Sequence, residues 1–121
     1  MLLNDFFTYK VIDQEEGKWT CQLEFNAEHN IYKGHFPGLP VTPGVCQVQI
    51  VQEVVSDILD QEYSLRGARD IKFLNFIDPH KTPKLNLELT LKEKEAEVLS
   101  VTALMVNEGV NFLKMRSTFS K

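Results

Sequence analysis

One segment of the chain has a helical pattern, and its apolar surface is too broad for a helix that lies on the outside of a protein. Apolar side chains recur at three- and four-residue spacing in two stripes, which are Val45, Val48, Val51, Val55 and Ile58, and Cys46, Ile50, Val54 and Leu59. This pattern predicts a helix that is largely buried. We expect it to begin with Thr42 as N-cap and Pro43 as the first helical residue, and to end at about residue 60 or 61.

The segments on either side of this helix have the pattern of β-strands. Residues 6–13 and 19–25 flank a turn at 15–18 and predict an antiparallel hairpin. After the helix, strand patterns cover residues 64–77, with an interruption near Gly67, and then residues 85–91, 98–106 and 110–119. The strand at 98–106 is apolar on both faces, so it should be central. We therefore expect an α+β fold with about six antiparallel strands curved around one buried helix.

The composition excludes several classes of protein. The 121 residues fit a single domain, 1–121, that can bury one hydrophobic core. A net charge of −4 argues against a general grip on nucleic acid. The sequence lacks the roughly 18 consecutive apolar residues of a membrane helix, and its start lacks the pattern of a signal peptide. Cys21 and Cys46 are too few for a disulfide framework and lack the spacing of a zinc site. One bridge between them stays open, but we expect a reduced, cytoplasmic protein with no metal and no other cofactor.

The segment that enters the helix has the residue types of a reactive site. Residues 34–44, GHFPGLPVTPG, combine glycines with three prolines and predict a rigid, tightly turned loop. The N-terminus of a helix exposes unpaired N–H groups and has a partial positive charge, and Gly44 has no side chain that would keep a ligand away from them. His35 has an ordinary pKa of about 6.5, which suits proton transfer. A base beside an amide that polarises a carbonyl can move a proton at the carbon α to that carbonyl. A histidine in a loop is, however, more often a polar surface residue.

Residues 26–45 resemble the signature of the bacterial β-hydroxyacyl-acyl carrier protein dehydratases, which are hotdog-fold enzymes of fatty acid synthesis. The stretch GHFPGLPVTPGV at residues 34–45 is the strongly matching part, and a weaker similarity extends to residues 67–73, 77–79 and the three closing strands. The resemblance implies a curved antiparallel sheet wrapped around one long central helix. It also implies a substrate carried by acyl carrier protein, and a homodimer or larger homo-oligomer with its active sites at the subunit interface.

The resemblance implies roles for individual residues as well. His35 would handle the proton at the α-carbon of the substrate, and Gly44 would donate its amide to the thioester carbonyl. The acidic residue of the family, which acts on the β-hydroxyl from the other subunit, corresponds to Gln49, and glutamine cannot donate a proton as a carboxylic acid does. Glu53, one turn later on the same helix face, is either a substitute for it or a solvated charge. The remaining candidates for contact with the substrate are Phe36, Pro43 and Val45.

Other residues near the loop receive simpler interpretations. We expect Tyr32 to pack the loop, a function that Phe36 could equally serve. His29 and His80 are expected at the surface, although a supporting role in the site is open to His29. An acidic carrier protein requires a basic docking face, for which the candidates are Arg66, Arg69, Lys72, Lys81 and Lys84.

Three functions are compatible with these residues. The leading interpretation is a dehydratase that converts 3-hydroxyacyl thioesters on acyl carrier protein to trans-2-enoyl thioesters, in fatty acid or related lipid synthesis. The glutamine at position 49 leaves two alternatives open. One is a thioesterase of the same fold that hydrolyses acyl thioesters, and the other is a non-catalytic acyl-binding subunit, such as the inactive partner of a heterodimer.

Overall fold

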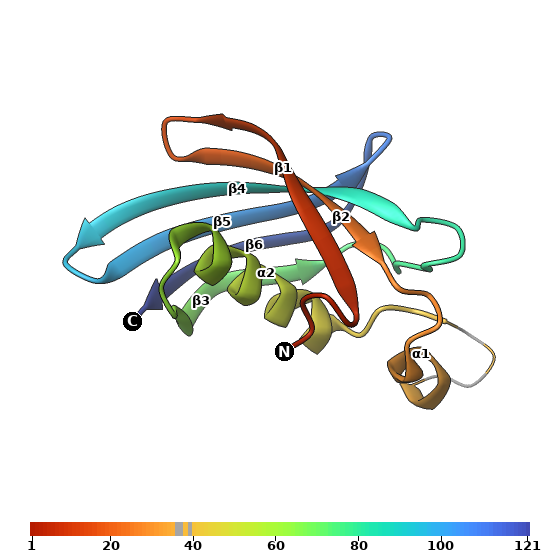
Figure 1. The fold of residues 1–121 in the computed structure, drawn as a ribbon. Helices are drawn as coiled ribbons and strands as arrows, with labels where there is room; N and C mark the ends of the chain where they lie inside the picture. Colours follow the sequence, from red (N-terminus) through yellow and green to blue (C-terminus); the bar gives the residue numbers. More distant parts are fainter. Residues whose placement is uncertain (36–37, 39) are drawn as a thin grey trace.

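The structure, a computed structural model, describes residues 1–35, 38 and 40–121, except for the side chain of His35 (Figure 1). In chain order, the elements of the described part are β1 (Phe7–Glu15), β2 (Lys18–Phe25), α1 (Asn30–His35), α2 (Gly44–Leu59), β3 (Ser64–Phe73), β4 (Lys84–Glu95), β5 (Val98–Asn107) and β6 (Val110–Ser120).

The strands form one antiparallel sheet in the order β1-β2-β4-β5-β6-β3, with α2 lying across the concave side of its curve (Figure 1). This arrangement confirms the predicted α+β architecture of a curved sheet around one long helix. β5 lies between β4 and β6, as its apolar faces predict. The predicted interruption near Gly67 is present as two register shifts in the pairing of β3 with β6.

The core lies between α2 and the sheet. Ile50, Val51, Val54 and Val55 of α2 are fully buried, and so are alternate residues of β2 and β4, including Cys21, Leu23 and Leu87. Each fully buried aliphatic side chain contributes about 1.5–3 kcal/mol relative to exposure. The helical and alternating patterns of the sequence therefore identified these buried positions correctly.

The start of α2 differs from the prediction. Pro43, not Thr42, is the N-cap residue, and no side chain of the described residues caps the helix. The reason is that Thr42 is committed elsewhere, because its backbone N–H donates to the Ile77 carbonyl (2.8 Å) and its hydroxyl bonds to the Tyr32 hydroxyl (2.9 Å). Val45, although part of the apolar pattern, is 78% exposed. The short helix α1 was not predicted.

Candidate active site

The two ends of the segment between α1 and α2 are held together by Tyr32 and Thr42. Their hydroxyl groups share a hydrogen bond of 2.9 Å in a buried position. The Tyr32 ring stacks on Phe6, with the ring centroids 5.2 Å apart. Burial raises the pKa of Tyr32 to about 12, so its hydroxyl stays protonated at neutral pH. Tyr32 therefore packs the base of the segment, as predicted, and fixes the end of α1 near the start of α2.

His35 is the last residue of α1, three residues after Tyr32. Its side chain lies outside the described part of the chain, and so does Phe36. The positions of these two side chains relative to Gly44 therefore stay predictions.

The other two histidines have different surroundings. His29 is half-buried, which corrects its expected place at the surface, because its ring packs edge-on against Phe6. Its Nδ1 accepts the N–H of Ile31 (3.1 Å), so Nε2 carries the proton and donates to Asp5 (3.0 Å). His29 thus ties the first turn of α1 to the N-terminal segment. His80 is exposed, as predicted.

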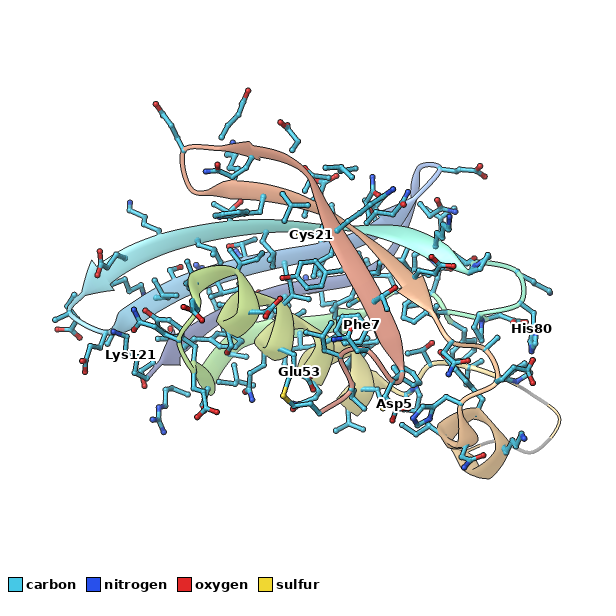
Figure 2. All side chains as sticks on the ribbon, viewed as in Figure 1. Asp5, Phe7, Cys21, Glu53, His80 and Lys121 are labelled. Atoms are coloured by element: carbon cyan, nitrogen blue, oxygen red, sulfur yellow. The ribbon has the colours of Figure 1, made fainter. Side chains whose placement is uncertain are left out.

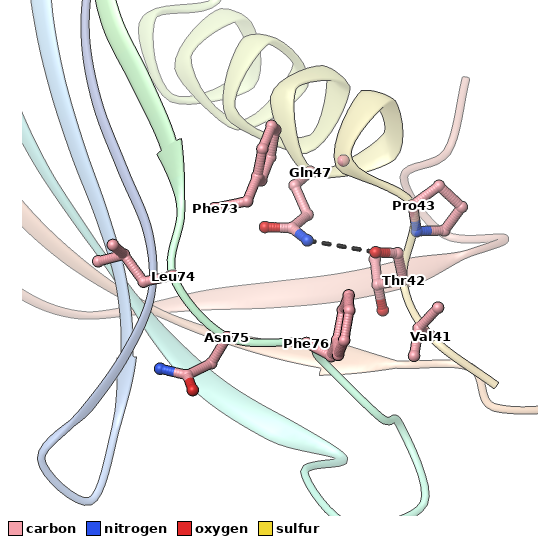
Figure 3. A pocket seen from close by; sticks show the side chains of 9 residues that line it. Val41, Thr42, Pro43, Gln47, Phe73, Leu74, Asn75 and Phe76 are labelled. Atoms are coloured by element: carbon pink, nitrogen blue, oxygen red, sulfur yellow. Dashed lines mark hydrogen bonds between the residues drawn. The ribbon is translucent and has the colours of Figure 1, made fainter. Parts of the chain in front are cut away.

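A cavity of ≈ 430 Å³ lies at the start of α2 (Figure 3). One side consists of residues 41–44 and Gln47, and the other of residues 73–76, which follow from the end of β3. Two of the predicted substrate-contacting residues, Pro43 and Gly44, belong to this lining. Val45 does not, since it lies on the exposed side of the helix.

Gly44 has a neighbour that the sequence did not reveal. A Cβ atom at this position would lie 2.8 Å from Cζ of Phe73 and 3.1 Å from both Cε atoms. The Phe73 ring therefore occupies the space that a side chain at position 44 would need. The carbonyl of Pro43 accepts the N–H groups of Cys46 (3.0 Å) and Gln47 (3.1 Å). Helix geometry leaves the earlier N–H groups, including that of Gly44, without an acceptor inside the helix, so they can bind a carbonyl oxygen.

Gln49 and Glu53 lie together on another side of α2. The Gln49 amide donates to Glu53 Oε2 (2.8 Å), and the same carboxylate accepts the backbone N–H groups of Leu2 (2.9 Å) and Leu3 (2.7 Å). Glu53, labelled in Figure 2, is only 5% exposed. The expectation of a solvated charge was wrong, because the N-terminal segment folds over the helix and buries the carboxylate.

Both residues line a second cavity of ≈ 530 Å³, which does not include Gly44 in its lining. Within one chain, the structure therefore brings Gln49 and Glu53 together but separates them from the cavity at Gly44.

Gln47 also lines the first cavity, and it is not among the residues predicted from the sequence. It is 3% exposed, and its Nε2 donates to the Thr42 carbonyl (3.2 Å). Its Oε1 is buried and has no hydrogen-bond partner among the residues that the structure describes. The sequence contains a signal for it, because Gln47 has helical spacing to the buried Ile50, Val51 and Val54. A glutamine on the apolar stripe of a buried helix is unusual.

Comparison with known proteins adds the family. The protein-family model for the ApeI-like proteins, described as ApeI dehydratase, matches residues 11–109, which is more than half of the chain. The chain belongs to the ApeI-like dehydratase family. This membership confirms the dehydratase resemblance that residues 26–45 indicated.

Curated relatives of this ApeI-like chain are named 3-hydroxyacyl-[acyl-carrier-protein] dehydratase FabZ. The protein from Novosphingobium aromaticivorans is 29% identical over 96 residues, covering 69% of this chain and 61% of the relative. The protein from Mannheimia succiniciproducens is 27% identical over 108 residues, covering 83% and 71%. The chain spans 57–64% of the length of four such relatives.

Solved structures share the fold of this ApeI-like chain. The dehydratase heterocomplex ApeI:P from Xenorhabdus doucetiae has a TM-score of 0.69 at 21% identity, covering 93% of this chain and 97% of that chain. A hypothetical thioesterase with coenzyme A from Streptococcus pneumoniae has a TM-score of 0.67 at 10% identity, covering 93% and 84%. At these identities the similarity establishes the hotdog fold alone.

Proposed function

We propose that residues 1–121 act as one domain that removes water from 3-hydroxyacyl thioesters on acyl carrier protein, giving trans-2-enoyl thioesters for fatty acid or related lipid synthesis. The observation that supports this most strongly is membership in a dehydratase family over residues 11–109. The cavity at the start of α2, with Pro43 and Gly44 in its lining, is a suitable place for the thioester. Phe36 and Val45 remain proposed contacts with the substrate.

In the proposed reaction, the thioester oxygen accepts the N–H of Gly44, and His35 removes a proton from C2. The electron pair of the broken C2–H bond forms the C2=C3 double bond while the C3–O bond breaks. The departing hydroxyl takes up a proton and leaves as water. The developing charge on the thioester oxygen is stabilised by the helix N-terminus, which is the usual origin of catalysis at such sites.

The proton for the departing hydroxyl needs a source. Three donors of this chain already bond to the Glu53 carboxylate, so we assign it a structural role. We propose that Gln49 of a second subunit orients the hydroxyl through its amide. His35 then returns to the hydroxyl the proton that it removed from C2.

The deciding experiment is a parallel assay of the purified protein with 3-hydroxyacyl and acyl thioesters, following both enoyl absorbance and thiol release. We expect the enoyl product without thiol, and a loss of at least about 100-fold in His35→Ala. Gln49→Glu, which restores a carboxylic acid, should raise the rate. Release of thiol without enoyl product would refute the dehydratase and establish a thioesterase.

A thioesterase is the second candidate because Gln49 occupies the acid position and a thioesterase structure shares the fold. A folded protein that binds acyl thioesters without turning over any of them would indicate a non-catalytic subunit instead. Such a subunit would require a catalytic partner chain. One of the solved structures that share the fold is a dehydratase heterocomplex.

The proposed partners are acyl carrier protein and a second copy of this chain. β3 is an edge strand, and its exposed Arg66, Arg69 and Lys72 offer a basic surface to an acidic carrier. Light scattering of the purified protein would give the number of subunits. No helix among the described residues is long and apolar enough to cross a membrane, and we propose a cytoplasmic location.

A further inference from the structure

The cavity at the start of α2 contains a buried acceptor that the proposed reaction does not use. Gln47 lies three residues after Gly44, so both face the same side of the helix. The glutamine side chain is almost fully buried, and its Oε1 has no partner in the described part of the chain. A buried polar atom without a partner costs about 1–3 kcal/mol, so such an atom calls for an explanation.

The orientation of the Gln47 amide is fixed by its neighbour. The Thr42 carbonyl can only accept a hydrogen bond, so the amide nitrogen must face it. The oxygen must then point the other way, toward the β3 side of the cavity (Figure 3). The opposite assignment would place two oxygen atoms 3.2 Å apart and is excluded on electrostatic grounds. The cavity wall thus holds an acceptor in a fixed direction, and because this atom is buried, a neighbouring side chain of the lining must move before a ligand reaches it.

The cavity therefore offers a ligand two complementary groups, a donor at the Gly44 amide and an acceptor at Gln47. We propose that Gln47 Oε1 accepts a hydrogen bond from a donor on the same acyl thioester whose carbonyl binds Gly44. This inference rests on the proposed function and specifies its substrate. The donor is either the 3-hydroxyl of the acyl chain or the first amide N–H of a pantetheine-type arm, since both lie a few bonds from the carbonyl.

A buried acceptor of this kind produces selectivity rather than affinity alone. A ligand with the donor satisfies Oε1, whereas an analogue without it leaves the atom unpaired. The expected discrimination is about tenfold or more, since each 1.4 kcal/mol corresponds to a factor of ten in the dissociation constant.

Four oxoester probes test this proposal. They combine a 3-hydroxyoctanoyl or octanoyl group with an N-acetylethanolamine or pentyl arm, so that hydroxyl and amide are each present or absent. Oxoesters keep the carbonyl but have a less acidic α-proton, and mass spectrometry confirms that they stay intact. Calorimetry then gives dissociation constants for the wild-type protein and for Gln47→Met.

For each donor, the ratio divides the dissociation constant of the probe that lacks it by that of the probe that has it. We expect one of the two ratios, for the hydroxyl or for the amide, to be about tenfold in the wild type. In Gln47→Met this ratio should fall to within twofold of unity. The ratio that falls identifies the donor. The far-UV circular dichroism and the urea-unfolding midpoint of Gln47→Met, compared with those of the wild type, separate loss of recognition from loss of folding.

Gln52→Met is the matched control. Gln52 lies on the same helix, and its Oε1 already accepts the Leu65 N–H (3.0 Å), so its replacement should leave both ratios unchanged. Wild-type ratios near unity, or ratios that survive Gln47→Met, would overturn the inference while dehydration activity stands. If the folded wild-type protein binds none of the probes and turns over no thioester, the proposed function fails, and the inference fails with it.

Discussion

At the residue scale, Gly44 is constrained from two directions. The sequence suggests that a ligand needs its bare amide, and the structure adds that the Phe73 ring fills the place of a Cβ atom. We expect Gly44→Ala to push this ring aside and to reduce kcat/KM at least about tenfold by reshaping the cavity. Stability should change by less than about 1 kcal/mol, because Phe73 is 51% exposed and can move.

The double variant Gly44→Ala/Phe73→Ala tests the cause. Removing the ring makes room for the new methyl group. Gly44→Ala should therefore reduce kcat/KM less in the Phe73→Ala background than in the wild type. Simple additivity of the two losses would show that the ring is not involved, and that the methyl group acts on the ligand directly.

The same scale shows why residue roles were harder to predict than residue types. Gly44 and Pro43, which the loop motif indicated, lie in the lining of the cavity at the helix start, and their contact with the substrate stays a prediction. Glu53 was misjudged because its burial depends on Leu2 and Leu3, which have no pattern that predicts a contact some fifty residues away.

At the element scale, the carboxylate of Glu53 connects the N-terminal segment to α2. In Glu53→Gln, one oxygen becomes an NH₂ group that faces another donor, so at least one hydrogen bond is lost. We expect the free energy of unfolding, measured with urea, to be about 1–3 kcal/mol lower than in the wild type. Amide exchange at Leu2 and Leu3 should accelerate further than in the rest of the chain.

Glu88→Gln is the control for this prediction. Glu88 is exposed on β4, so the substitution makes the same chemical change without affecting a buried partner. Equal stability of the two variants, with unchanged exchange at Leu2 and Leu3, would mean that the N-terminal segment is held by its apolar contacts instead.

Elements with a long pattern were predictable, and the short helix was not. α2 and the strands follow their periodicity to within a few residues, except that the predicted strand 64–77 ends at Phe73. α1 has six residues and contains Gly34, so its local preference for a helix is weak. Its stability comes from contacts made by His29 and Tyr32 with Phe6, which no local pattern reveals.

At the scale of the whole molecule, the sheet and helix were predictable from hydrophobic patterns, but the cavity was not. One side consists of residues 41–44 and Gln47, and the other of residues 73–76; the two are distant in sequence, and the second follows from the end of β3, which pairs with β6 at the edge of the sheet. Periodicity identifies which side chains are buried, whereas a cavity depends on where they fail to fill space.

The buried ionisable groups of the fold make its stability sensitive to alkaline pH. Burial raises the pKa of Cys21 to about 11 and that of Tyr32 to about 12, and it also raises that of Tyr9. In the unfolded chain these groups lose their protons from about pH 9–10, whereas the folded chain still holds them. The unfolded state then binds fewer protons, so stability is fully present below about pH 9 and falls as the pH rises toward 12.

Urea unfolding at intervals from pH 7 to pH 11 measures this loss, with return to pH 7 as the check for reversibility. Cys21→Ala removes one of the groups, so its stability, although lower at pH 7, should fall less steeply between pH 9 and 11, by on the order of 1 kcal/mol. A matching slope in the two proteins would mean that the Cys21 thiol ionises as easily in the fold as outside it. That result would contradict its complete burial between the sheet and α2.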